Sequence, residues 1–220
     1  MNILWTGEKV KKLIDKYVTS LWINPHIPPI SIMDRDFDDF LNGQHSNKAK
    51  ASEMEHAIRY HISENYENDP EFFKPLSERL EEIIGSQKDN WDKLVEDLKK
   101  FLDKAKAGRW DTAIDWLNVK QMPFYDIIKN TIFEDWQITD KQTSKIIELT
   151  IEVYEILIKE LDTINFWWDI SSQNKIKVLI NDFINKSKLL KITQENIKLK
   201  EVLIEKIFNL AKHLDKKLIN

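Results

Sequence analysis

Histidine and carboxylate side chains lie close together in residues 55–61, the stretch most able to support metal or acid–base chemistry. His56 and His61 are five residues apart, which on a helix places them about 140° apart, so they cannot chelate one ion together. Glu55-His56 also lacks the second histidine four residues on that a zinc-protease helix needs. His61 belongs to an apolar stripe and is interpreted as a core histidine.

Glu55, His56 and Arg59 share the opposite face of the same predicted helix. Glu55 and Arg59 are four residues apart and can form an ion pair along that helix. The simplest interpretation is a solvated face. The alternative, which we keep as a hypothesis, is a patch that binds a partner protein.

Other catalytic patterns fail on their spacing. Asp34, Asp36 and Asp38 resemble a calcium loop, but its sixth position is Asp39 rather than glycine and its twelfth is His45 rather than glutamate. The chain has no cysteine, which excludes disulfides and thiolate ligands. It also has no phosphate-binding loop and no Gly-x-Ser-x-Gly nucleophile motif. The sequence therefore predicts no catalytic residue, no metal ligand and no cofactor site.

Positive charge is concentrated near the end of the chain. Residues 1–169 contain 22 Lys and Arg against 32 Asp and Glu, whereas residues 170–220 contain 11 against 5. A lysine-rich helical face could attract the phosphates of double-stranded DNA. The alternative is that long helices carry lysines on their solvated side, and the lack of arginine after Arg109 disfavours base recognition. The candidate DNA-binding residues are Lys186, Lys188, Lys191, Lys198 and Lys200.

Aromatic residues offer a second kind of binding site. The run Phe166-Trp167-Trp168 is interpreted mainly as core, and any part of it that remains exposed could anchor a partner protein. Trp91 is assigned to the core.

Apolar residues repeat at helical spacing along most of the chain, and no glycine follows Gly108 and no proline follows Pro123. Expected helices cover 7–21, a short segment ending at 42, 52–62, 70–84, 91–107, 123–133, 140–161, the segment before 184, and the segment before 214. We expect a kink or a new helix start at Pro75, and Gly85 as the residue after a helix end. Expected helix caps are Thr6, Ser52 with Glu55, Asp69 before Pro70, Asn90, Thr139 with Gln142, Asp169 or Ser171/Ser172, and Thr193.

These patterns predict an all-α fold, a multi-helix bundle in two helical lobes comprising residues 1–110 and 111–220, with the boundary between 108 and 122. With 42% hydrophobic and 32% charged residues, the composition is that of a globular protein. No apolar run approaches the roughly 20 residues that a membrane span needs. No secretory signal is visible at the start, so we expect a cytoplasmic protein without membrane contact.

Residues 48–62 resemble the signature of the C-terminal helical region of type I restriction enzyme R subunits. The stretch reads Lys48-Ala49-Lys50-Ala51-Ser52-Glu53-Met54-Glu55-His56-Ala57-Ile58-Arg59-Tyr60-His61-Ile62. Residues 68–74 and 76–83 continue the resemblance, as do Ile27-Pro28-Pro29, Phe37-Asp38, Asp89-Asn90-Trp91, Pro123-Phe124-Tyr125, Phe166-Trp167 and Ala211-Lys212-His213-Leu214. Tyr60 and Pro75 depart from the family pattern.

R subunits combine a nuclease domain, two RecA-like motor lobes and this helical region. The present chain has neither the phosphate loop of the motor nor a strand-borne nuclease motif. The resemblance therefore implies a non-catalytic assembly region of a larger ATP-dependent endonuclease, whose ATP and Mg²⁺ would belong to its motor and nuclease domains. Implied partners are the methyltransferase and specificity subunits and the rest of the R subunit. The alternative is a helical module that guides double-stranded DNA near the motor.

Overall fold

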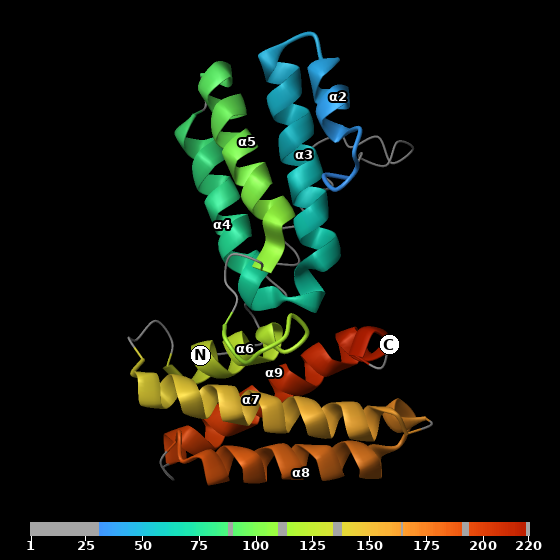
Figure 1. The fold of residues 1–220 in the computed structure, drawn as a ribbon, viewed down its shortest axis with the longest axis vertical. Helices are drawn as coiled ribbons and strands as arrows, with labels where there is room; N and C mark the ends of the chain where they lie inside the picture. Colours follow the sequence, from blue (N-terminus) through green and yellow to red (C-terminus); the bar gives the residue numbers. More distant parts are fainter. Residues whose placement is uncertain are drawn as a thin grey trace. The chain divides into compact units, whose positions relative to one another are not determined.

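The computed structural model describes residues 31–87, 90–109, 114–133, 138–163, 165–190 and 194–218. These residues form an all-α fold without strands (Figure 1). The elements are α2 (Phe37–Asn42), α3 (Asn47–Asn65), η1 (Tyr66–Asn68), α4 (Pro70–Ser86), α5 (Trp91–Ala107), α6 (Met122–Phe133), α7 (Asp140–Leu161), η3 (Phe166–Trp168), α8 (Ile170–Ser187) and α9 (Gln194–Leu218), where η denotes a 3₁₀ turn.

The chain divides into two compact units. Unit 1 comprises residues 1–64 and 77–106, and unit 2 comprises residues 65–76 and 107–220. The sequence placed residues 65–76 in the first lobe, whereas the structure assigns η1 and the first turns of α4 to unit 2.

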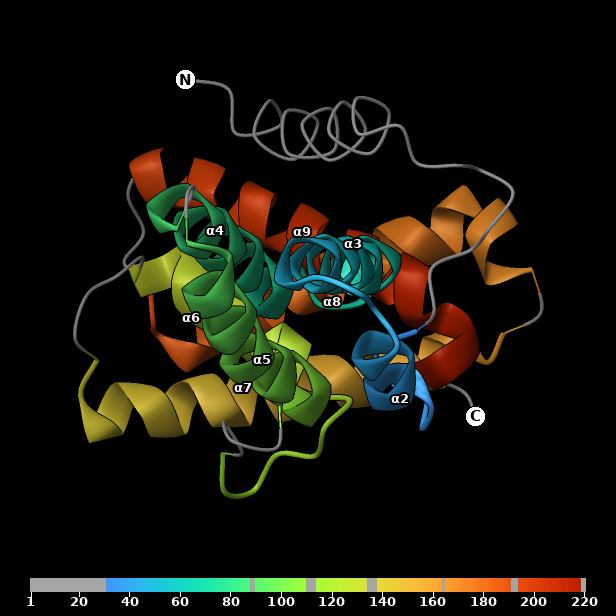
Figure 2. The same ribbon diagram turned by 90° about the horizontal axis from the view of Figure 1, so that it is seen from above.

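Unit 1 contains α2, α3, α5 and most of α4. The three longer helices run alongside one another in Figure 1, and Figure 2 looks down on their ends. Each helix buries one apolar stripe, because its apolar residues recur every three or four positions. The most deeply buried side chains include Phe37, Met54, Ile58, Leu80 and Leu98.

Unit 2 has a larger apolar core made by α6, α7, α8 and α9. α7 packs on α8, α8 on α9, and α6 on both α7 and α9. The partners along α7 and α8 show that these helices are antiparallel, since Lys175 pairs with Glu160 and Lys186 with Glu152. Fully buried members of this core include Phe124, Ile128, Ile146, Leu157, Ile176, Ile180, Ile184, Leu203 and Ile207.

Most predicted helix starts are confirmed. The Thr139 hydroxyl accepts a hydrogen bond from the Gln142 amide, and the Gln142 side chain accepts one from the Thr139 amide. Asn90 caps α5, and the Asp169 carboxylate accepts hydrogen bonds from the amides of Ser171 and Ser172 at the start of α8. Asp69 caps α4 directly before Pro70, and its carboxylate accepts a hydrogen bond from the Phe72 amide.

Two predicted helix ends are wrong. Ser52 lies inside α3, which begins at Asn47, and the hydroxyl that accepts the first-turn hydrogen bond is that of Ser46, from the Ala49 amide at 3.1 Å. The intervening Lys and Ala residues favour helix, so α3 extends back to the earlier serine. Gly85 does not follow the end of α4 but lies within it, whereas Gly108, at φ +61°, follows α5 as predicted.

Pro75 lies inside α4, and no new helix starts there. The helix continues because the lost hydrogen bond is a single one near its first turns. Several residues named in the sequence predictions lie outside the described residues. They are the helix at 7–21 with its cap Thr6, the cap Thr193, the candidate Lys191, and the resemblance residues Ile27-Pro28-Pro29 and Asp89.

Candidate functional site

The predicted partner-binding residues lie on α3, where two of them join an ion-pair network within unit 1. The Arg59 Nε donates to the Glu55 Oε1 at 2.9 Å, and the Arg59 Nη1 donates to the Glu81 carboxylate on α4. Arg59 exposes only 16% of its side chain, so this face of α3 is half-buried against α4 rather than solvated. His56 is also half-buried. The role of Glu55, His56 and Arg59 in partner binding stays a prediction.

Burial opposes the charge on Arg59, but its hydrogen bonds to Glu81 and Glu55 outweigh that cost and raise the pKa of Arg59. Burial lowers the pKa of His61, which is half-buried on the same helix. The partial burial of its ring is compatible with the interpretation as a core histidine.

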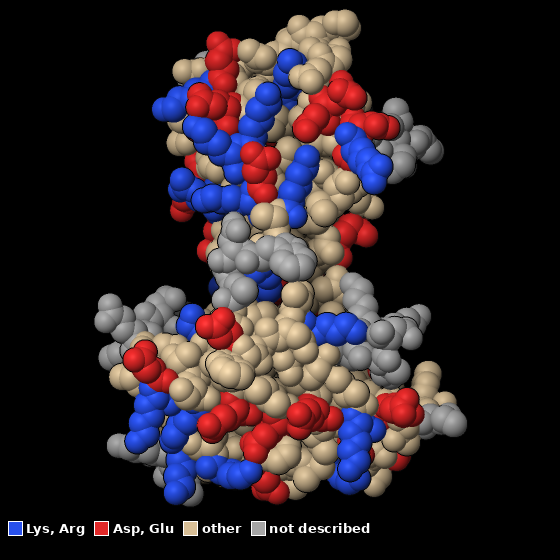
Figure 3. Space-filling model, in the orientation of Figure 1, with Lys and Arg blue, Asp and Glu red and all other residues tan. Residues whose placement is uncertain are grey.

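Four lysines of α8 and α9 form ion pairs with a carboxylate on a different helix. The pairs are Lys175 with Glu160 at 3.1 Å, Lys177 with Glu205 at 2.6 Å, Lys186 with Glu152 at 2.6 Å, and Lys206 with Glu71 at 3.8 Å. On the face shown in Figure 3, basic and acidic residues are interspersed over α7 and α8. The excess positive charge of the sequence is therefore used in part to join helices.

The other candidate DNA-binding lysines differ in their surroundings. Lys188 ends α8 with a left-handed backbone at φ +55° and is exposed, and Lys198 is exposed on the first turn of α9. Neither forms an ion pair with a described residue. Lys200 donates a hydrogen bond to the Asn185 side chain at 2.9 Å, which links α9 to α8. Their role in DNA binding stays a prediction.

A buried charge cluster in unit 2 was not predicted. The Arg109 guanidinium, 8% exposed, donates two hydrogen bonds to the Asp69 carboxylate and one to the Asp126 carboxylate on α6. It also lies over the Phe72 ring, 5.3 Å from its centre. The cluster joins the start of α4 to α6, which explains why residues 65–76 belong to unit 2. Its members are up to 57 residues apart, so no local pattern could have revealed it.

Two carboxylates share one guanidinium in this cluster, which leaves one excess negative charge. Burial raises the pKa of Asp69 because removal from water penalises its carboxylate more than the bonds from Arg109 and the Phe72 amide favour it. Burial also opposes the charge on Arg109, but the hydrogen bonds to both carboxylates raise its pKa. The cluster links the start of α4 to α6 through ion pairs that are largely shielded from solvent.

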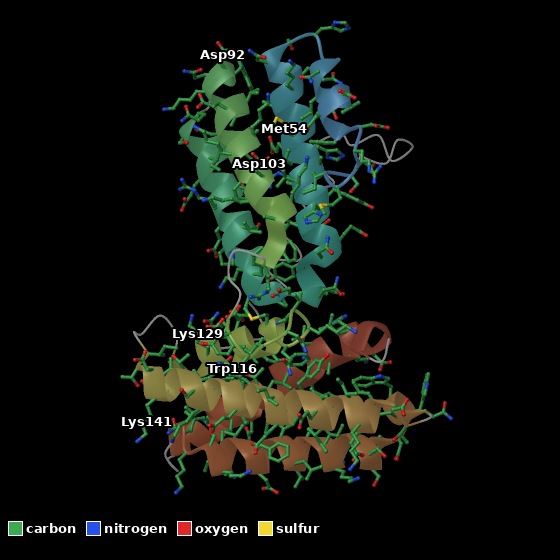
Figure 4. All side chains as sticks on the ribbon, viewed as in Figure 1. Met54, Asp92, Asp103, Trp116, Lys129 and Lys141 are labelled. Atoms are coloured by element: carbon green, nitrogen blue, oxygen red, sulfur yellow. The ribbon has the colours of Figure 1, made fainter. Side chains whose placement is uncertain are left out.

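The tryptophans are distributed between core and surface. Phe166 is buried, Trp167 is half-buried against Phe208 with ring centres 5.2 Å apart, and Trp168 is 87% exposed. The prediction that Trp91 is core is wrong, because it is 38% exposed at the first position of α5, where Lys48 covers its ring. Trp116, labelled in Figure 4 on the segment before α6, is 88% exposed.

Within the described ranges, no group of three His, Cys, Asp or Glu side chains could hold a metal ion. No helix in the described part of the chain combines the length and the apolar character needed to cross a membrane. Comparison of the chain with protein-family models, curated proteins and solved structures gave no match. The link to R subunits therefore rests on the sequence resemblance described above.

Proposed function

We propose that this chain is a non-catalytic docking region of a type I restriction-modification R subunit. It would hold the ATP-dependent translocase and endonuclease to the methyltransferase core. The resemblance of residues 48–62 to the R-subunit signature supports the family, and the all-α scaffold is compatible with an assembly role. We propose a cytoplasmic location and no catalytic activity for the chain itself.

The observation that favours docking over DNA guidance is the pairing of the C-terminal lysines. Lys177, Lys186 and Lys206 each lie within 4 Å of a carboxylate on another helix. A lysine that already has an anionic partner gains less from a phosphate, because the two anions compete for one ammonium group. The lysine-rich half of the chain therefore supports a scaffold better than an extended phosphate-binding face.

Size-exclusion chromatography of the chain with the purified methyltransferase core, which consists of methyltransferase and specificity subunits, tests this proposal. We expect a single complex that contains all components. A chain that elutes separately at micromolar concentration, and an R subunit that still assembles after residues 31–218 are deleted, would refute the docking role.

DNA guidance remains the second candidate because Lys188 and Lys198 are exposed without ion pairs to the described residues. A gel-shift titration of duplex DNA at increasing salt tests it. Binding through two or three phosphate contacts should weaken by roughly three- to sevenfold for each doubling of salt. The double variant Lys188→Gln, Lys198→Gln should then lose most of this salt dependence, whereas Lys175→Gln, at a paired lysine, should change it less.

A further inference from the structure

The turn that joins α7 to α8 places two large apolar side chains in water. Trp168, the last residue of η3, is 87% exposed, and Ile170, the first residue of α8, is 72% exposed. Isolated exposed apolar residues are common on protein surfaces, but tryptophan is among the residues most enriched in binding hot spots.

This turn is fixed to the core of unit 2. Phe166 is buried, and its ring packs edge-on against that of Trp167 with centres 5.0 Å apart. The Gln173 side chain donates a hydrogen bond to the Trp167 carbonyl at 2.8 Å. Asn165 adopts the left-handed backbone at φ +61°, a conformation that asparagine tolerates better than most residues. Trp168 therefore projects from a backbone that these contacts hold against the core, and such an anchor reduces the entropy lost on binding.

Exposed residues without charge continue from Ile170 along one side of α8. Ser171, Asn174 and Val178 recur at helical spacing and are exposed, and Val178 exposes 59% of its surface. The neighbouring Lys175 is paired with Glu160 on α7. Glu160 therefore offsets the charge of Lys175, which leaves little net charge among these residues, and depletion of charge at the centre is what distinguishes protein interfaces from ordinary surface.

Carboxylates occur around this apolar centre. Asp162 ends α7, Asp169 lies between the two apolar residues, and Asp182 lies one turn beyond Val178; all three are exposed. None of them forms an ion pair with a described residue. Hydrogen bonds from the Ser172 hydroxyl and the Ser171 amide lower the pKa of Asp169, so its carboxylate stays charged. The exposed lysines of α8 in this region, Lys175 and Lys186, are paired with carboxylates of α7, so the excess charge of the rim is negative and favours a basic partner surface.

We propose that Trp168, Ile170 and Val178 form a docking surface for a partner protein. The matching partner surface has an apolar pocket that receives the Trp168 indole and Lys or Arg residues around it that face Asp162, Asp169 and Asp182. This inference rests on the proposed function, under which the partner is the methyltransferase core.

The chain contains a matched control for this site, since Trp116 is as exposed as Trp168 and belongs to the same unit. The Kd of the full chain for the purified methyltransferase core is measured by isothermal titration calorimetry for the wild type, Trp168→Ser and Trp116→Ser. Loss of a hot-spot tryptophan raises Kd by roughly 30-fold or more. We expect that change for Trp168→Ser and less than about a threefold change for Trp116→Ser, with circular dichroism spectra unchanged for both.

A second variant tests the acidic rim. Asp182→Lys should raise Kd by about tenfold at low salt and by less at high salt, because exposed charges are screened. Wild-type affinity in Trp168→Ser overturns this inference but leaves the proposed function standing, whereas a wild-type chain that does not bind overturns both. An equal loss in Trp116→Ser, or a Trp168-dependent dimer of the chain in analytical ultracentrifugation, also overturns it.

Discussion

The two units use their charged residues differently. In unit 1, Arg79 pairs with Glu82 and Lys100 with Glu96 along a single helix, and only some ion pairs, such as Arg59 with Glu81, connect two helices. In unit 2, the ion pairs described above connect different elements, as with Arg109 and its two carboxylates. A pair within one helix stabilises only that helix, whereas a pair between helices also fixes how they pack. The charge of unit 2 is therefore part of its tertiary structure.

Arg109→Met should have the largest effect on stability. Removal of the guanidinium leaves two carboxylates close together and partly buried, which should lower the free energy of unfolding by about 3–5 kcal/mol. Urea unfolding followed by circular dichroism measures this loss, and hydrogen exchange should become faster in residues 65–76.

Arg79→Met is the matched control for that experiment, because Arg79 is 65% exposed and its ion pair lies along one helix. Its loss should be at most about 0.5 kcal/mol. Arg109→Lys keeps the charge but loses the bidentate contact with Asp69. Its loss in free energy of unfolding should lie between those of Arg109→Met and Arg79→Met. Similar losses at Arg109 and Arg79 would contradict the contrast between the units.

Arg59→Met should have an intermediate effect, since Arg59 provides a cross-helix ion pair in unit 1. The loss of hydrogen bonds from a half-buried guanidinium to Glu55 and Glu81 should cost about 1–3 kcal/mol. Denaturant unfolding measures it. If Glu81→Gln alone produces nearly the whole loss, the bond to α4 is the important one; no loss from Glu81→Gln would show that Arg59 acts only along α3.

The success of these sequence predictions depended on how local each signal was. The caps at Thr139, Asn90 and Asp69 were predictable because acceptor and donor lie within three residues of each other. Ser52 was a false cap because Ser46 offered the same chemistry six residues earlier, and the sequence gives no means to rank them. The Arg109 cluster depends on the tertiary fold and had no sequence signal.

The aromatic run shows the same limit. Spacing indicated that Phe166, Trp167 and Trp168 adjoin a core, and Phe166 does. Which ring remains outside depends on the 3₁₀ geometry of the turn, because three consecutive residues in such a turn point in three directions. The sequence therefore indicated that one of these rings could be exposed, and only the structure shows that it is Trp168.

The pH dependence of stability should show a smaller effect, due to His61. Its pKa is lowered by burial, so as the pH falls below about 6.5 the unfolded chain takes up a proton that the folded chain does not. The free energy of unfolding should therefore decrease as the pH falls from 7.5 towards 5.5. In His61→Gln this part of the slope should disappear, while above pH 7.5 the difference between the two proteins should be constant. An unchanged slope in His61→Gln would show that the imidazole is not desolvated.

The smallest expected effects come from two lysines that form matched ion pairs. Lys100 with Glu96 along α5 and Lys186 with Glu152 between α8 and α7 have the same 2.6 Å separation, and the two lysines are 69% and 71% exposed. Glu152 is less exposed than Glu96, at 34% against 66%, so solvent screens its pair less. Double-mutant cycles with Gln should give a coupling of up to about 1 kcal/mol for Lys186 and a smaller one for Lys100. A coupling at Lys186 no larger than that at Lys100 would mean that the exposed cross-helix ion pairs do not stabilise helix packing in unit 2. The electrostatic contribution to that packing would then come from the buried Arg109 cluster.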